Sequence, residues 1–181
     1  MELEKQSIGM LQTETKKWYA IYTRSRFEKK VEEELKSKGI ETFLPLVKTI
    51  RKWSDRKKIV REAMFKGYVF VNINLTKERF DVLSCLGAVR FIYFNGRATE
   101  ISKYDLNWIR ILSAGENKLN ETQVVSGKNF KPDEKVKIID GVLKGMIGTV
   151  SQVSKKVVQI YFESIQQSLY LEIQPELLEK I

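Results

Sequence analysis

The chain has 181 residues, of which 43% are hydrophobic and 30% charged, an ordinary composition for a folded protein of one domain or two small ones. Because it contains no histidine and a single cysteine, histidine-based catalysis, the usual zinc sites and an internal disulfide are excluded. The net charge of +9 favours a polyanionic partner.

The sequence shows no membrane or secretory segment. No apolar run approaches the roughly 18 residues of a membrane span, and the first residues lack the layout of a signal peptide. We therefore expect a cytoplasmic protein with no membrane contact, no cofactor and no bound metal. Cys85 lies among apolar residues, which predicts a small buried thiol and not a reactive one.

Residues 1–15 are polar and are predicted to form a flexible tail. Residues 18–24 then alternate as a strand that carries aromatic side chains on both faces. The Ser-x-x-Glu spacing of Ser25 and Glu28 predicts a capping box at the start of a helix that ends near Gly39.

A second strand is predicted at residues 40–47, bent or at a sheet edge because Pro45 interrupts it. The segment 48–66 follows it and holds eight basic and two acidic residues, so it carries +6 of the total charge of +9. Within it, residues 48–61 are expected to form a ribbon or hairpin that turns at Ser54-Asp55.

The strand predicted at residues 64–72 is rich in aromatic and β-branched residues. Tyr68 and Phe70 alternate onto one face and the valines onto the other. A strand with apolar side chains on both faces must be packed against other elements or a partner on each face to remove them from water. The aromatic face is therefore either core or a surface for a partner.

A helix at 76–86, with Thr76 as its cap, a strand at 89–94 and a helix from 102 to near 115 follow, with a tight turn at Asn95-Gly96. Strand, helix, strand, strand, helix, strand is the split βαβ, or ferredoxin-like, order, in which helices cover one face of a four-stranded antiparallel sheet. The other face is expected to be open. The residues that alternate onto it are Trp18, Tyr22, Tyr68, Phe70, Ile92 and Phe94.

A polar stretch at 116–127 is the predicted linker between a first domain at 16–115 and a second at 128–181. In the second, short β-branched segments recur at regular spacing with glycines between them, which predicts a five-stranded SH3-like β-barrel. It has eight basic and seven acidic residues, so it lacks the positive bias of the first domain. The predicted fold class is α+β.

The residues alone allow two interpretations of the aromatic strand. The segment from Lys66 to Ile73 comes close to the strand signature of RNA recognition motifs, which stack single-stranded bases on a split βαβ sheet, but Val69 and Ile73 depart from it. Alternatively, the aromatic residues simply fill a core. Neither interpretation accounts for a basic hairpin joined to an SH3-like barrel.

A third interpretation rests on five segments spread over both domains. They are Trp18-Tyr-Ala-Ile-Tyr-Thr-Arg, Phe43-Leu-Pro-Leu, Met64-Phe-Lys-Gly-Tyr-Val-Phe-Val, Gly87-Ala-Val-Arg-Phe and Asp140-Gly-Val-Leu-Lys-Gly-Met-Ile-Gly-Thr-Val. Together they resemble the NusG family of transcription elongation factors over about residues 17–181, and the last resembles the KOW motif of its C-terminal barrel. The basic hairpin is similar to that of the UpxY-like paralogs, which promote antitermination in capsular polysaccharide operons of Bacteroides-type bacteria. The chain departs from the family pattern at Lys66, Ala98 and Val142.

This resemblance implies that the open face of the N-terminal (NGN) domain binds the clamp helices of the largest RNA polymerase subunit. The candidate polymerase contacts carried over by motif are Tyr22, Phe65, Tyr68, Phe70 and Phe94. The candidates at positions that approach the non-template DNA strand in specialised paralogs are Arg24, Arg26 and Lys30. In the hairpin, phosphate contact with DNA or nascent leader RNA is expected for Arg51, Lys52, Arg56, Lys57 and Lys58.

We therefore expect a monomeric, non-catalytic elongation factor that promotes processivity or antitermination at surface polysaccharide operons. Its barrel is expected to recruit a second factor, for which the family suggests ribosomal protein S10 or termination factor Rho. The β-branched content of 136–173 favours a barrel over the helical hairpin that masks the polymerase site in one relative. The alternative hypothesis is a stand-alone module that binds single-stranded RNA.

Overall fold

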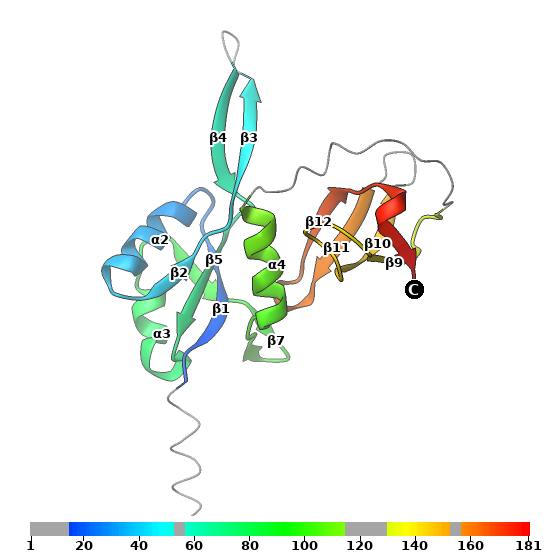
Figure 1. The fold of residues 1–181 in the computed structure, drawn as a ribbon. Helices are drawn as coiled ribbons and strands as arrows, with labels where there is room; N and C mark the ends of the chain where they lie inside the picture. The colour runs from blue at the N-terminus through cyan, green and yellow to red at the C-terminus, as the bar shows by residue number, and fades with distance from the viewer. Residues whose placement is uncertain (1–14, 53–56, 115–129, 153–156) are drawn as a thin grey trace, which may run out of the picture. The chain divides into compact units, whose positions relative to one another are not determined.

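The computed structural model describes residues 15–52, 57–114, 130–152 and 157–181 (Figure 1). The chain divides into two compact units, Met1–Lys103 and Tyr104–Ile181. The predicted tail apart from residue 15, the hairpin turn at Ser54-Asp55 and the predicted linker at 116–127 lie outside the described residues.

The first unit is built on a four-stranded antiparallel sheet, as the split βαβ pattern predicts, with the strand order β2-β5-β1-β6. The strands are β1 at Lys17–Thr23, β2 at Glu41–Phe43, β5 at Tyr68–Ile73 and β6 at Ala88–Phe91. The central pair, β1 and β5, runs from Lys17 opposite Ile73 to Tyr22 opposite Tyr68. The aromatic strand begins at Tyr68, later than predicted, because Met64 to Gly67 form a bend and turn.

Two helices, α2 at Glu28–Ser37 and α3 at Leu75–Leu83, cover one face of this sheet (Figure 1). Val31 and Leu35 of α2 and Val82 of α3 are fully buried against Val69 and Val71 of β5, within one hydrophobic cluster. Each such side chain contributes about 1.5–3 kcal/mol by leaving water. This face is therefore the core that holds the sheet in place.

The predicted capping box at the start of α2 is wrong. Phe27 holds the N-cap position without a side-chain hydrogen bond, and the preceding residue, Arg26, has a positive φ of 66°. The Glu28 carboxylate accepts a hydrogen bond from the backbone N–H of Gly67 at 2.7 Å instead of folding back on its own helix. The helix end is as predicted, since Gly39 follows it with φ of 73°.

A short hairpin follows β6 and is formed by β7 at Tyr93–Phe94 and β8 at Arg97–Ala98. Asn95 and Gly96 both have positive φ, 49° and 75°, as a tight two-residue turn requires. The turn predicted at this dipeptide is therefore confirmed.

A longer ribbon, β3 at Leu46–Lys52 and β4 at Lys57–Ala63, is inserted between β2 and β5. It forms a two-stranded sheet of its own and projects from the first unit (Figure 1). Pro45 lies between β2 and β3, where the chain leaves the main sheet, so the predicted interruption at this residue is confirmed.

The second unit contains helix α4 at Lys103–Ser113 and a five-stranded antiparallel sheet in the order β12-β11-β10-β9-β13. The strands are β9 at Lys135–Ile138, β10 at Ile147–Gln152, β11 at Val157–Phe162, β12 at Gln167–Glu172 and β13 at Leu178–Lys180, with short 3-10 helices at Glu163–Ile165 and Pro175–Leu177. Gly148 lies in β10, which pairs with β11, and an added Cβ there would lie 2.8 Å from the Gln159 carbonyl oxygen. Only glycine permits this close approach.

Almost all of helix α4 belongs to the second unit, although we expected it in a first domain that ends at residue 115. The units divide between Lys103 and Tyr104. The hydroxyl of Ser164 donates a hydrogen bond to the Asp105 carboxylate, and the hydroxyl of Tyr104 donates to the carbonyl of Gly145 at 3.4 Å. These contacts join α4 to the 3-10 helix that follows β11 and to the turn that precedes β10.

The α3 N-cap generates the first prediction. Asn74, not the predicted Thr76, caps the helix, because its side-chain oxygen accepts hydrogen bonds from the backbone N–H groups of Thr76 and Lys77 at 3.1 and 3.2 Å. Asn74→Ala should lower the free energy of unfolding by about 1 kcal/mol in urea titrations followed by circular dichroism. Asn74→Ser, which keeps a capping oxygen, should lose less. Equal stability of Asn74→Ala and the natural chain would show that the cap contributes nothing.

Candidate functional site

Three side chains lie in one row on the sheet face opposite the helix-covered core. Tyr22 of β1 pairs with Tyr68 of β5 on one side and with Arg90 of β6 on the other. The tyrosine rings meet edge to face with centroids 5.7 Å apart, and Cζ of Arg90 lies 5.9 Å from the Tyr22 centroid. Tyr22 is 40% exposed and Arg90 is exposed. We call this row the aromatic rung; it combines apolar contact area with a cation.

Gly67 fixes the position of the aromatic rung. It has φ of 79°, and an added Cβ would lie 3.0 Å from Cε2 of Tyr22. Its carbonyl accepts a hydrogen bond from the N–H of Thr23, while its own N–H donates to Glu28. The Tyr22 ring therefore packs against the Gly67 backbone, and any side chain at position 67 would crowd the ring.

Two of the five aromatic candidates are buried. Phe65 is 3% exposed and Phe70 has no exposed surface; the Phe70 ring centroid lies 6.3 Å from that of Phe65 and 6.0 Å from that of Phe43. Position 70 faces Ala20 on the neighbouring strand, whose small side chain leaves room for a large ring. The prediction that Phe70 lies on an open face is therefore wrong, and the core interpretation holds for Phe70 and Phe65 in the free chain.

The other residues that the sequence assigns to the open face differ in exposure. Phe94, in the β7–β8 hairpin, is 56% exposed, whereas Tyr68 and Trp18 are half-buried. Ile92 is buried, so its predicted place on an open face is wrong. Fewer of these aromatic residues are exposed than the sequence predicts: those of the aromatic rung, and Phe94 in its own two-stranded hairpin.

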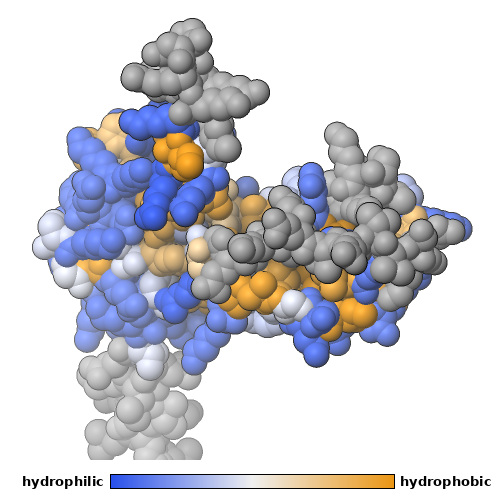
Figure 2. Space-filling model, turned by 45° about the horizontal axis from the view of Figure 1, so that its top comes forward, coloured by the Kyte–Doolittle hydropathy of each residue, from blue (hydrophilic) through white to orange (hydrophobic). Residues whose placement is uncertain are grey.

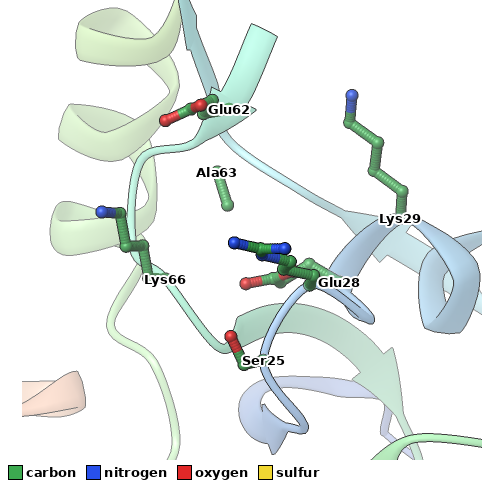
Figure 3. A pocket seen from close by; sticks show the side chains of 7 residues that line it. Ser25, Glu28, Lys29, Glu62, Ala63 and Lys66 are labelled. Atoms are coloured by element: carbon green, nitrogen blue, oxygen red, sulfur yellow. The ribbon is translucent and has the colours of Figure 1, made fainter.

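A pocket of about 430 Å³ lies between the start of α2 and the end of β4. Figure 3 shows Ser25 and Glu28 on one side, facing Glu62, Ala63 and Lys66 along the chain that leaves the ribbon. Its lining residues are Ser25, Arg26, Glu28, Lys29, Glu62, Ala63 and Lys66. With three cations and two carboxylates, the pocket offers both donors and acceptors to a polar ligand.

Among the three basic candidates near α2, the structure places only Arg26 in this pocket. Arg24 is exposed, and its backbone N–H donates to the carbonyl of Gly87. Lys30 is exposed beside the ring of Phe27, with Nζ 5.7 Å from the centroid. Lys29 is not among the candidates, because its sequence position indicates only a charged, solvated helix face. It nevertheless lines the pocket.

Lys29 also links α2 to the ribbon, because its Nζ donates to the backbone carbonyl of Arg61 at 3.1 Å. Lys66 is the second lining cation that motif reasoning did not single out, and it lies in the turn before β5. The charge clustering at 48–66 was the available signal for Lys66, whereas only the fold brings Lys29 to the ribbon.

The register of the ribbon sets basic residues opposite basic residues. Lys48 pairs with Arg61, Arg51 with Lys58 and Lys52 with Lys57. Lys48, Lys58 and Arg61 are exposed. Arg56 lies outside the described residues, and only the backbone is described for Arg51, Lys52 and Lys57. Like charges opposite one another cost stability, so this arrangement is typical of a surface that receives a polyanion.

Cys85 is buried, as predicted. Burial raises the pKa of its thiol above the ordinary value, although Nζ of Lys38 lies 3.3 Å from the sulfur. The group therefore stays protonated and unreactive near neutral pH.

Within the described ranges, no cluster of three acidic, cysteine or histidine residues is arranged for a metal ion. In the same ranges no helix has the length and apolarity to span a membrane.

The second unit has a groove lined by residues of α4, β10 and β11. Its volume is about 550 Å³, and Tyr104, Trp108, Ile147 and Tyr161 are among its lining residues. Ile147 and Tyr161 are exposed. The rings of Tyr104 and Trp108 meet edge to face at 5.9 Å. The groove therefore offers aromatic and aliphatic contact area on the second unit.

Comparison with known proteins points to one family. Residues 16–110 match the family model NusG, described as transcription termination factor nusG. The transcription termination/antitermination protein NusG of Chlamydia pneumoniae is 31% identical over 147 residues, which cover 76% of this chain and 78% of that protein. The protein of the same name from Bacillus subtilis strain 168 is 22% identical over 183 residues, covering 92% and 99%.

A solved structure also resembles this chain along most of its length. It is described as domain interaction in Thermotoga maritima NusG, and the match covers 92% of this chain and 97% of that one. The two share 26% sequence identity, with a TM-score of 0.58.

The different burial of the aromatic candidates gives the second prediction. Phe70→Ala should cost about 3–5 kcal/mol of unfolding free energy because it leaves a cavity. Tyr22→Ala should cost about 1.5 kcal/mol or less, since it removes one edge-to-face contact at a partly exposed site. Urea unfolding of both variants measures the difference. Similar losses would contradict the assignment of Phe70 to the core and Tyr22 to the surface.

Proposed function

Because the chain belongs to the NusG family of transcription termination factors, we propose that it binds elongating RNA polymerase and promotes processivity and antitermination. Members of this family are transcription factors and not enzymes, so the predicted absence of catalysis is confirmed by the family. Binding one state of a pausing equilibrium more tightly than another is sufficient for such an activity. The family match favours this function over a stand-alone RNA-binding module.

The observation that carries the proposal is the exposed aromatic surface of the first unit. Tyr22, Tyr68 and Phe94 offer ring surface that a partner would remove from water, and such aromatic anchors dominate the energetics of interfaces. Arg90, beside Tyr22, adds a hydrogen-bond donor at the edge of the surface. The proposed partner is the pair of clamp helices of the largest polymerase subunit; Phe65 and Phe70, the other two candidates for this contact, are buried in the free chain.

Nucleic acid is the second proposed partner of the first unit. Arg26, Lys29 and Lys66 line a pocket at the foot of the basic ribbon, so positive charge continues from the ribbon to the start of α2. We assign Arg24, Arg26 and Lys30 to the non-template DNA strand, and the ribbon to DNA or nascent leader RNA. Clustered cations gain affinity by releasing condensed counterions.

For the second unit, we propose that the five-stranded sheet is a KOW-type SH3-like barrel that recruits a further factor. Ribosomal protein S10 and termination factor Rho are the candidates, and the exposed Ile147 and Tyr161 provide apolar contact area. We further propose that the factor is monomeric and cytoplasmic. The resemblance of the hairpin sequence at 48–58 to the polysaccharide-operon paralogs supports specificity for surface polysaccharide operons.

The third prediction tests polymerase binding directly. A Tyr22→Ala, Tyr68→Ala, Phe94→Ala variant should lose co-purification with core RNA polymerase at moderate salt, because its aromatic anchors are gone. Loss of two or more anchors should weaken binding by at least about 100-fold. Tagged protein and polymerase, mixed and recovered on resin, provide the measurement.

Phe80→Ala is the matched control, since Phe80 is 79% exposed on α3 and lies outside the aromatic surface. It should bind like the natural chain, and melting curves should show that every variant is folded. Failure of the folded natural chain to bind polymerase would refute the proposal. Equal weakening by Phe80→Ala would refute the choice of surface.

A further inference from the structure

The ribbon β3–β4 has the form of a rooted, projecting two-stranded element. Each strand has seven residues, paired only with the other strand, and at roughly 3.4 Å per residue the ribbon is about 20 Å long. Its foot is held because Leu46 and Ala63 pack against the hydrophobic core and Met64 N–H donates to the carbonyl of Pro45 at 2.8 Å. Figure 1 shows the ribbon extending from this foot, away from the four-stranded sheet.

Positive charge occupies both faces of the ribbon. Lys48 and Arg61 are directly opposite one another and therefore share a face. Lys58 is three residues from Arg61 on the same strand, so it lies on the other face. All three are exposed. A ligand that neutralises them must therefore bring negative charge to both sides of the ribbon.

The face of Lys48 and Arg61 also carries an apolar group. Ile59 is 67% exposed, two residues from Arg61. Figure 2 shows a small hydrophobic area within a largely hydrophilic surface, just below the grey segment at the top of the view. No residue of the described ribbon, Leu46–Lys52 and Lys57–Ala63, is aromatic. The two strands themselves therefore offer no ring on which single-stranded bases stack; Trp53, between them in the sequence, lies outside the described residues.

These features fit a duplex groove. The major groove of B-DNA is about 12 Å wide, admits a two-stranded β-ribbon and has phosphates along both walls. The major groove of A-form RNA is too narrow for side chains to read. An exposed apolar side chain between cations matches a groove that presents thymine methyl groups.

We propose that the ribbon β3–β4 enters the major groove of duplex DNA, with Lys48 and Arg61 directed to the phosphates of one wall and Lys58 to those of the other. The inference deepens the proposed function and rests on it for its setting: a polymerase-bound factor would hold the duplex beside the transcription bubble. The ribbon is then a double-strand contact, separate from the single-strand contact assigned to Arg24, Arg26 and Lys30.

Fluorescence anisotropy of the full chain, without polymerase, tests this on three probes of equal charge. They are a DNA duplex of about 20 base pairs, roughly two helical turns, single-stranded DNA and an RNA stem-loop. The duplex should bind most tightly. Lys48→Ala, Arg61→Ala should lower the slope of log affinity against log salt by about 2, because each lost phosphate contact removes about 0.9.

Lys36→Ala, Arg97→Ala is the matched control. It removes the same charge from exposed sites on α2 and β8 and should leave the slope unchanged. Methyl green, a major-groove ligand, should displace the protein from the duplex, whereas the minor-groove ligand netropsin should not. Circular dichroism confirms that the variants are folded.

Tighter binding of single-stranded DNA or of the RNA stem-loop would overturn the proposal, as would an unchanged slope in Lys48→Ala, Arg61→Ala or displacement by netropsin alone. The same variant should still co-purify with RNA polymerase. If the duplex does not bind but polymerase does, the ribbon proposal fails and the proposed function stands. If polymerase does not bind the natural chain, the proposed function fails whatever the duplex assay gives.

Discussion

The pairing of β1 with β5 is the interaction on which the first unit depends. Its register places Ile21 opposite Val69 and Tyr19 opposite Val71, so one side of the pair is apolar and fully covered by α2 and α3. A slip of one residue would exchange the faces and expose that core. The same register brings Tyr22 beside Tyr68 on the other side, so the proposed binding surface is a consequence of core packing.

Glycine at position 67 connects this pairing to the rest of the site. The carbonyl of Gly67 accepts a hydrogen bond from the N–H of Thr23 at the end of β1, and its N–H donates to the Glu28 carboxylate at the start of α2. The ring of Tyr22 packs against the Cα of Gly67. The pocket at the foot of the ribbon is lined by residues 25–29, around the start of α2, and by residues 62–66, at the end of β4 and just before Gly67. The contacts of Gly67 therefore set the positions of the aromatic rung and of the pocket at the foot of the ribbon. The residues of these two features come from separate segments of the sequence.

Much of the fold follows from the sequence, because alternation and turn chemistry are local signals. The valines of β5, the dipeptide Asn95-Gly96 and the interruption at Pro45 each gave the correct element. Helix starts were less predictable: the Ser-x-x-Glu spacing at Ser25 gave a wrong cap, because Glu28 found a tertiary partner in Gly67. A local motif cannot show that competition.

The candidate site was predictable only in part. The sequence indicated which aromatic residues share a face, but it did not show that Phe70 would be enclosed by neighbouring rings while Tyr22 stays at the surface. Burial depends on the neighbours across strands, such as Ala20, which are distant in sequence. Likewise, the hydrogen bond from Lys29 to the ribbon joins residues that are distant in sequence. The same is true of the contact between Ser164 and Asp105 that joins α4 to the second unit, and sequence periodicity predicts neither contact.

The central claim is that the aromatic surface of the first unit acts on a transcribing polymerase. Single-round transcription through a leader that contains a terminator, with and without the purified factor, tests it most directly. We predict that the natural chain raises the fraction of full-length RNA and that a folded Tyr22→Ala, Tyr68→Ala variant leaves it at the factor-free level. A folded natural chain that binds polymerase yet leaves this fraction unchanged, on leader templates from the proposed class of target operons, would contradict the account.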